Sequence, residues 1–210
     1  MKTKAIFLDI DGVLNSYGEN SKSKCGNYVG IDKDKVKRLA KIVQETDAIL
    51  ILTSSWKMGW EPKRKYTVYK YGIYEPATNY HAKYLDNHLK KKGKLVLTDK
   101  TRERNLAERG NGIKAYLTQH PEITDWIVLD DEIFADFDEE EIIPHLILTD
   151  PDLGLTDTDA AEAIKILNRE KPLYDKDTIY FDPFTYKYKR NGPNLLKEWK
   201  LWEEIFMLKL

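Results

Sequence analysis

A short apolar segment that ends in two carboxylates sets the main constraint on how this 210-residue chain folds. Residues 5–8, Ala-Ile-Phe-Leu, have the length and side chains of a fully buried strand, and Asp-Ile-Asp-Gly follows at positions 9–12. Asp9 and Asp11 are close enough that each carboxylate raises the cost of ionising the other, and a divalent cation with oxygen ligands offsets that cost. Gly12 allows a sharp turn. The alternative is an ordinary Asp-rich turn at a strand end.

Apolar segments elsewhere in the chain predict a parallel α/β sheet. We expect strands over 4–9, 48–52, 95–97, 126–129 and 146–148, and helices over 33–45, 77–91, 102 or 110 to 119, and 159–168. The expected helix N-caps are Asp32 and either Asp157 or Thr158, and Gly93 is an expected helix end. Strands that alternate with helices are typical of βαβ units, so the sequence predicts a five-stranded parallel sheet with helices on both faces.

Composition limits the class of protein and its partners. Charged residues make up 33% of the chain and hydrophobic residues 41%, which indicates a globular protein. The formal net charge of −1 gives no global basic field, so contact with nucleic acid requires a local basic patch. The one cysteine, Cys25, excludes an intramolecular disulfide and favours a cytoplasmic location. No apolar run approaches the length of a membrane span, so we expect no membrane partner.

Polar residues also follow the second and fourth predicted strands. Thr53 and Ser54 supply hydroxyl and backbone N–H groups that can hold phosphoryl oxygens, although taken alone they are more typical of a helix N-cap. Asp130 and Asp131 are candidate metal ligands, or else part of a solvated acidic turn. Because the carboxyl ends of parallel strands meet at one edge of a sheet, we expect these residues to converge with Asp9.

Five motifs in order carry a resemblance to a known family. DxDGVLN, ILTSSW, R-G-x-x-I, IVLDD and LTDxxxGLT span residues 5–156 and resemble the haloacid dehalogenase (HAD) superfamily of phosphotransferases. The arrangement is similar to a HAD subgroup associated with RNA repair proteins and small phage or bacterial phosphatases. The resemblance implies a Rossmann-like sheet with a minimal cap, a Mg²⁺ cofactor and a phosphorylated substrate.

The same resemblance assigns roles to the aspartates. It implies that Asp9 is the nucleophile, which becomes an aspartyl phosphate, and that Asp11 is the general acid and later the general base. Asp9, Asp11, Asp130 and Asp131 are the implied metal ligands. Asp11 is expected to bind through its backbone carbonyl, Asp130 directly, and Asp131 as a second ligand or through water.

Two further positions complete the site that the resemblance implies. Thr53, with Ser54 as the close alternative, is expected to bind the substrate phosphate. A basic residue is expected to offset the charge on the nucleophile and the phosphate. We choose Arg109 because it lies in the R-G-x-x-I segment, although lysine is usual in the family and Lys114 is the other candidate.

The chain divides by composition into a catalytic unit and an extension. We expect a HAD-like domain over 1–170, with a flap at 12–31 and an insert at 57–92, and a C-terminal extension over 171–210 that carries an amphipathic helix packed on the core. The insert is rich in lysine and tyrosine, which suits backbone phosphates and stacked bases. A solvated helix with tyrosines turned partly inward is the simpler explanation. Residues 186–190 form a similar patch.

The sequence thus favours a Mg²⁺-dependent phosphomonoester hydrolase that acts through an aspartyl phosphate on nucleic-acid ends or nucleotides. One alternative is a small-metabolite HAD phosphatase whose insert sets specificity. The other is a catalytically idle HAD scaffold that binds a partner protein. The choice between phosphatase and phosphotransferase stays open because both share the aspartyl-phosphate step, and the oligomeric state stays open as well.

Overall fold

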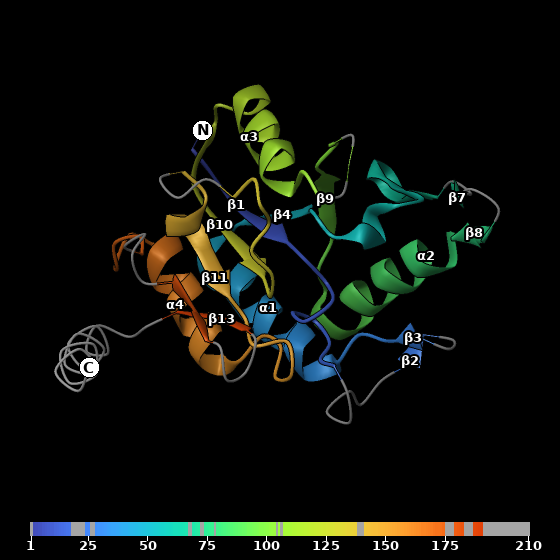
Figure 1. Cartoon of the computed structure of the whole chain (residues 1–210), viewed down its shortest axis with the longest axis horizontal. Coiled ribbons are helices and arrows are strands. Elements are labelled where there is room, and N and C mark those ends of the chain that lie inside the picture. Colours follow the sequence, from blue (N-terminus) through green and yellow to red (C-terminus); the bar gives the residue numbers. More distant parts are fainter. Residues whose placement is uncertain are drawn as a thin grey trace, which may run out of the picture.

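A five-stranded parallel sheet forms the centre of the molecule (Figure 1). The computed structural model describes residues 2–17, 24–25, 28–66, 69–71, 74–77, 79–103, 105, 107–137, 141–174, 179–182 and 187–190. The strand order is β11-β10-β1-β4-β9. The strands are β1 (Thr3–Leu8), β4 (Ile49–Leu52), β9 (Leu97–Lys100), β10 (Ile123–Asp130) and β11 (Leu146–Leu148). Each neighbouring pair is parallel, which confirms the predicted sheet.

Helices cover both faces of this sheet, as predicted. They are α1 (Lys33–Thr46), α2 (Asn79–His88), α3 (Arg109–Gln119) and α4 (Asp157–Leu167). Alternate residues of the central strand β1 enter two separate cores. Ile6 and Leu8 join the core that contains α1 and α4, whereas Phe7 packs on the α3 side, where its ring meets Tyr116 edge-on at 5.9 Å. A strand that is buried on both faces needs the continuous apolar run found in the sequence.

Several predicted boundaries were wrong by a few residues. The third strand begins at Leu97 instead of at residue 95, and Val96 is 66% exposed. The helix α2 begins at Asn79 instead of at residue 77 and continues as a π-helical turn, η4 (Leu89–Gly93), which ends at Gly93 as expected. The chain leaves this turn through Lys94, which has a left-handed φ of 57°.

The predicted N-cap is wrong for α4 and confirmed in position for α1. Thr156, not Asp157 or Thr158, caps α4, and it forms a capping box with Asp159. Asp32 does occupy the N-cap position of α1, but its side chain makes no capping hydrogen bond. Its carboxylate instead accepts a hydrogen bond from Lys35 Nζ at 2.8 Å.

The flap and the insert add small antiparallel pairs to the parallel sheet. In the flap, β2 (Lys24–Cys25) pairs with β3 (Tyr28–Val29). The 3-10 turn η2 (Ser55–Lys57) leads into the insert. The insert contains β5 (Trp60–Glu61), η3 (Pro62–Arg64), β6 (Lys65–Tyr66), β7 (Tyr69–Tyr71) and β8 (Tyr74–Ala77), which are followed by α2. It lies beside the β9 edge of the sheet (Figure 1). Its side chains over 64–80, which include much of the predicted lysine and tyrosine patch, lie outside the described residues.

The described part of the C-terminal region is the segment 171–174 and one further strand pair, β12 (Ile179–Asp182) with β13 (Lys187–Arg190). The amphipathic helix predicted for 194–209 lies outside the described residues. The side chains of the basic patch at 186–190 do so too, and the division at residue 170 stays a prediction. Within the described part of the chain, no helix has both the length and the apolarity to cross a membrane.

Candidate active site

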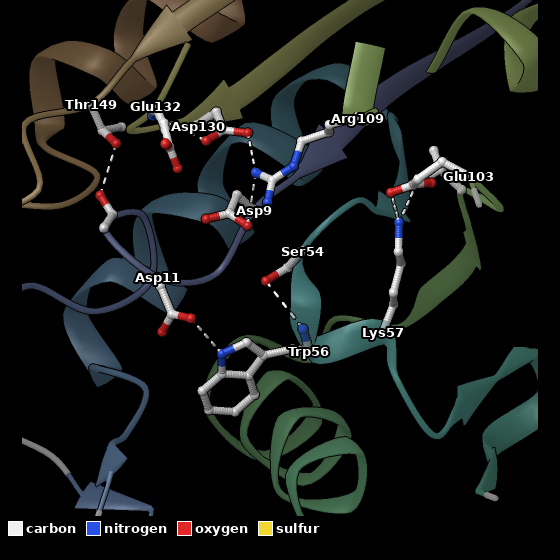
Figure 2. A network of polar contacts seen from close by, with 12 residues as sticks. Asp9, Asp11, Ser54, Trp56, Lys57, Glu103, Arg109, Asp130, Glu132 and Thr149 are labelled. Atoms are coloured by element: carbon white, nitrogen blue, oxygen red, sulfur yellow. Dashed lines mark hydrogen bonds and ion pairs between the residues drawn. The ribbon is translucent and has the colours of Figure 1, made fainter. Parts of the chain in front are cut away.

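The carboxyl edge of the sheet gathers the polar residues that follow its strands (Figure 2). Asp9 comes directly after β1, Thr53 after β4 and Thr149 after β11, and Asp130 is the last residue of β10. Hydrogen bonds between adjacent chains continue past the strand ends and hold this edge in register. Asp9 N donates to Leu129 O at 2.9 Å, for example. The parallel topology therefore brings residues far apart in sequence to one place.

Arg109 lies at the centre of this edge. Its Nη1 is 3.1 Å from Asp9 Oδ1 and also pairs with Asp130, and all three side chains are buried. The guanidinium packs over the Phe134 ring, 4.1 Å from the ring centroid. Burial lowers the Arg109 pKa, but the nearby charges of Asp130 and Asp9 outweigh that effect, so the net pKa is raised and the residue stays cationic.

The position after Arg109 has room only for glycine. A Cβ on Gly110 would collide with the backbone carbonyl of Asp136. The Asp136 side chain accepts a hydrogen bond from Asn111 N at 2.8 Å, which fixes the loop against the start of α3. Arg109 thus opens a helix whose first turn is held against the 131–137 loop. Lys114, the other candidate, is 37% exposed and pairs with Glu141 at 3.8 Å.

Three carboxylates surround the single guanidinium. Asp9, Asp130 and Asp131 each offer an oxygen, and these oxygens lie within 4.8 Å of one another. Burial, with the charge of Asp130, raises the pKa of Asp9 to about 8. Burial, with the charge of Asp9, raises the pKa of Asp131 to about 7. Burial raises the pKa of Asp130 to about 6 even though Arg109 opposes it.

This surplus of negative charge fits a divalent cation. Hard cations such as Mg²⁺ take oxygen ligands, and a dication would lower the cost of ionising all three carboxylates. The donor set here is entirely carboxylate oxygen. Asp9, Asp130 and Asp131 are therefore the residues suited to hold such an ion. Asp11 is expected at the metal through its backbone carbonyl, and its side chain is not part of this cluster.

Two hydrogen-bond donors hold the Asp11 carboxylate, which lies outside the cluster of three aspartates. Asn15 Nδ2 donates to Oδ1 at 2.8 Å, and Trp56 Nε1 donates to Oδ2 at 2.9 Å. The adjacent Gly12 has a φ of 67°, and a Cβ there would collide with the Asp131 carboxylate. Its carbonyl accepts a hydrogen bond from Thr149 Oγ1 at 2.8 Å. The turn after β1 thus requires glycine and is tied to the end of β11.

Thr53 and Ser54 place two buried hydroxyls beside the cluster. The Ser54 hydroxyl hydrogen-bonds to Asp9 and opposes the rise of the Asp9 pKa. The Thr53 Oγ1 is buried and has no hydrogen-bond partner among the described residues. The structure therefore brings both expected hydroxyls to the edge, with Ser54 the one in contact with Asp9.

Two residues at this edge have environments that sequence reasoning missed. Lys57, grouped with the solvent-facing lysines of the insert, is buried and pairs with Glu103, and its Nζ also donates to Thr101 Oγ1 at 3.0 Å. Burial lowers its pKa. Tyr17 is 45% exposed at the rim, where burial and the charges of Asp131 and Asp11 raise its pKa. The one signal for Lys57 was its place directly after the second strand-end motif.

A parallel α/β sheet that collects aspartates and one buried arginine at its carboxyl edge defines a phosphatase-type hydrolase of the HAD fold. The chain belongs to the family described as the HAD domain in Swiss Army Knife RNA repair proteins, whose model matches residues 5–160. That range contains the parallel sheet apart from the first two residues of β1, Thr3 and Lys4, and every residue of the candidate site. No curated protein and no solved structure matches the chain.

Proposed function

We propose that this protein is a Mg²⁺-dependent phosphomonoesterase that uses Asp9 as its nucleophile. The observation that carries the proposal is the placement of Asp9, which is 4% exposed and bonded to Arg109 and Ser54. One of its carboxylate oxygens lies within 4.8 Å of oxygens of Asp130 and Asp131. A carboxylate buried among other carboxylates is costly to ionise, and a purely structural site has little reason to keep it. Membership of the HAD family supports the same reaction class.

The residues of the site suit a two-step displacement. The ionised Asp9 attacks phosphorus and forms an aspartyl phosphate, while the leaving oxygen takes a proton from Asp11. In the second step Asp11 takes a proton from the attacking water, and Asp9 is released. A bound Mg²⁺ would supply charge neutralisation at the phosphoryl oxygens. Arg109 keeps Asp9 oriented and stabilises its ionised form, and Thr53 offers its unpartnered hydroxyl to the phosphate.

For the substrate, we propose phosphorylated nucleic-acid ends or nucleotides. The family description names RNA repair proteins. Tyr17 presents an exposed aromatic ring at the rim of the site, and base-to-aromatic stacking is a sequence-tolerant way to bind a nucleotide. A small-metabolite phosphatase is the second candidate. It is favoured by the insert beside the site, whose helix α2 contacts η2 and can act as a small lid.

The test is phosphate release with Mg²⁺, with EDTA, and with Asp9→Asn. Substrates are 3′- and 5′-phosphorylated oligonucleotides, mononucleotides and a set of sugar phosphates. We expect Mg²⁺-dependent release that Asp9→Asn abolishes, fastest from the oligonucleotide ends. Asp34→Asn is the matched control, because this carboxylate lies exposed on α1, and it should leave the rate unchanged.

Each outcome separates the candidates. Release only from small molecules would replace the nucleic-acid substrate with a metabolite. Release that persists in Asp9→Asn would overturn Asp9 as the nucleophile. A folded protein that releases phosphate from none of these substrates would favour the idle scaffold that binds a partner.

A further inference from the structure

Trp56 links the insert to Asp11, the proposed general acid. Its indole Nε1 lies 2.9 Å from Asp11 Oδ2, on the opposite oxygen from Asn15 (Figure 2). Trp56 is 9% exposed and Asp11 is half-buried, so the contact is partly removed from water. Trp56 follows the expected phosphate-binding hydroxyls by only two or three residues, and its backbone N–H donates to Ser54 Oγ at 3.4 Å. One short segment therefore contacts Asp9 through Ser54 and Asp11 through Trp56.

Both partners of Asp11 are groups that cannot accept its proton. An indole N–H is a donor only. The Asn15 amide is oriented by Gly12 N, which donates to Asn15 Oδ1 at 2.8 Å, so its NH₂ end faces Asp11. Each carboxyl oxygen has a second lone pair that remains available to carry the proton. Hence the two donors fix the plane of the carboxyl group without offering a competing route for the proton.

The insert holds the indole in place. The His81 ring meets the Trp56 ring at 64° and 5.3 Å between centroids, and the Tyr84 ring lies 6.2 Å away. Tyr84 in turn stacks on His88 at 3.9 Å, and its hydroxyl accepts a hydrogen bond from Ile31 N at 3.3 Å. The helix α2 and the end of the flap thus converge on the ring that contacts Asp11.

From this arrangement we infer that Trp56 is a positioning residue for the general acid. The inference rests on the proposed function, because it takes Asp11 to be that acid. Trp56 and Asn15 clamp the Asp11 carboxyl group, and the packing of α2 on Trp56 makes the position of the acid depend on the insert. The insert then helps to position the general acid, whichever substrate it contacts.

The dependence on leaving group tests this role. Proton donation matters most when the departing oxygen is a poor leaving group, and general acid catalysis is worth about 10²- to 10⁴-fold. Trp56→Phe should lower kcat/KM for uridine 3′-monophosphate by at least about 10-fold. For 2,4-dinitrophenyl phosphate, whose leaving group needs no proton, the loss should stay below about 2-fold. Because kcat/KM reports the first phosphoryl transfer, a slow second step does not hide the effect.

Trp60→Phe is the matched control. Trp60 makes the same kind of contact, with its Nε1 3.1 Å from Asp86 Oδ1, but the pair lies inside the insert and away from Asp11. This variant should keep the wild-type ratio of the two substrates. Equal losses on both substrates in Trp56→Phe, or the same selective loss in Trp60→Phe, would overturn the inference. If the wild type hydrolyses neither substrate nor any of the substrates above, the proposed function fails instead.

Two further measurements keep the test decisive. In an Asp11→Asn background, Trp56→Phe should cause no further selective loss, because there is no acid left to position. A selective loss that persists there would contradict the role. If Trp56→Phe does not fold, replacing Trp56 with the benzothiophene analogue of tryptophan keeps the bicyclic ring and removes only the N–H. The same selective loss is then expected.

Discussion

The two ends of strand β10 carry the same kind of ion pair in opposite surroundings. Near its start, Asp125 accepts two hydrogen bonds from Arg169 at 2.6 and 3.0 Å, and the Arg169 side chain is 60% exposed. At its end, Asp130 pairs with Arg109, and both side chains are buried. The bonds from Arg169 lower the pKa of Asp125, whereas burial raises the pKa of Asp130 to about 6.

The difference lies in the number of charges as well as in burial. The Asp125 pair is one carboxylate against one guanidinium, so its charges balance. At the other end, Asp9, Asp130 and Asp131 share Arg109, and negative charge is left over. The balanced pair is explained by stability alone. The surplus at the other end suits a cation, which is why we propose that the chemistry takes place there.

Replacing one aspartate at each end of β10 with asparagine should give the largest difference in activity. Asp130→Asn removes a proposed metal ligand. The loss of activity should exceed the roughly 10- to 100-fold that is typical of losing a residue that only hydrogen-bonds to a metal ligand. Asp125→Asn should keep full activity. Phosphate release at saturating and at limiting Mg²⁺ measures both. Equal activity in the two variants would remove Asp130 from the proposed metal set.

Replacing each arginine in turn should show that the two ion pairs contribute very differently to the free energy of unfolding. Arg109→Leu leaves buried carboxylates without a counter-charge and should cost about 3–5 kcal/mol of the free energy of unfolding. Arg169→Leu breaks an exposed pair and should cost about 1 kcal/mol or less. Urea denaturation at pH 8 without Mg²⁺ measures both. A cost for Arg169→Leu as large as that for Arg109→Leu would contradict the comparison.

The pH dependence of stability should show opposite signs at the two ends. A carboxyl group whose pKa is raised by folding stabilises the protein fully below its unfolded pKa, and this contribution is lost as pH rises through the folded value. For Asp130, Asp131 and Asp9 those values are about 6, 7 and 8. The metal-free protein should therefore lose a few kcal/mol of stability between about pH 5 and pH 8.

Two variants identify the groups responsible for that slope. Asp9→Asn should make the decrease of stability with pH smaller, because the amide does not titrate. Asp125 has a lowered pKa, so its contribution is present above its ordinary pKa and is lost as pH falls. Asp125→Asn should thus lower stability by about the same amount at pH 5 and at pH 8, and it should leave the slope between them unchanged. Urea midpoints in EDTA at pH 5 and pH 8 are the measurement, and a midpoint that rises with pH would contradict the prediction.

The sequence predicted the sheet and the convergence of Asp9, Thr53 and Asp130 because both follow from local patterns. Continuous apolar runs indicate buried strands, and parallel strands end at one edge. The helix boundaries were less accurate, since the cap of α4 depends on which of several neighbouring polar residues faces the first turn. The π-helical turn at 89–93 has no such local pattern.

The contacts around Asp11 could not be predicted in this way. Trp56 reaches Asp11 only because the insert packs against it, and that packing involves His81 and Tyr84, more than twenty residues further along the chain. Lys57 looked like a surface lysine because its partner Glu103 is distant in sequence. Such pairs depend on tertiary packing and leave no periodic signal in a single sequence.

The hydrogen bond from Thr149 to Gly12 joins two parts of the chain that are synthesised at different times. The two residues are 137 positions apart, so the turn that follows the first strand is completed by a hydroxyl synthesised much later. At typical rates of translation this delay is on the order of 10 s. During that time β1 lacks its partner β10, and its apolar edge is unpaired. We therefore expect the nascent chain to depend on chaperones until β10 and β11 have emerged, and to have no assembled site before then.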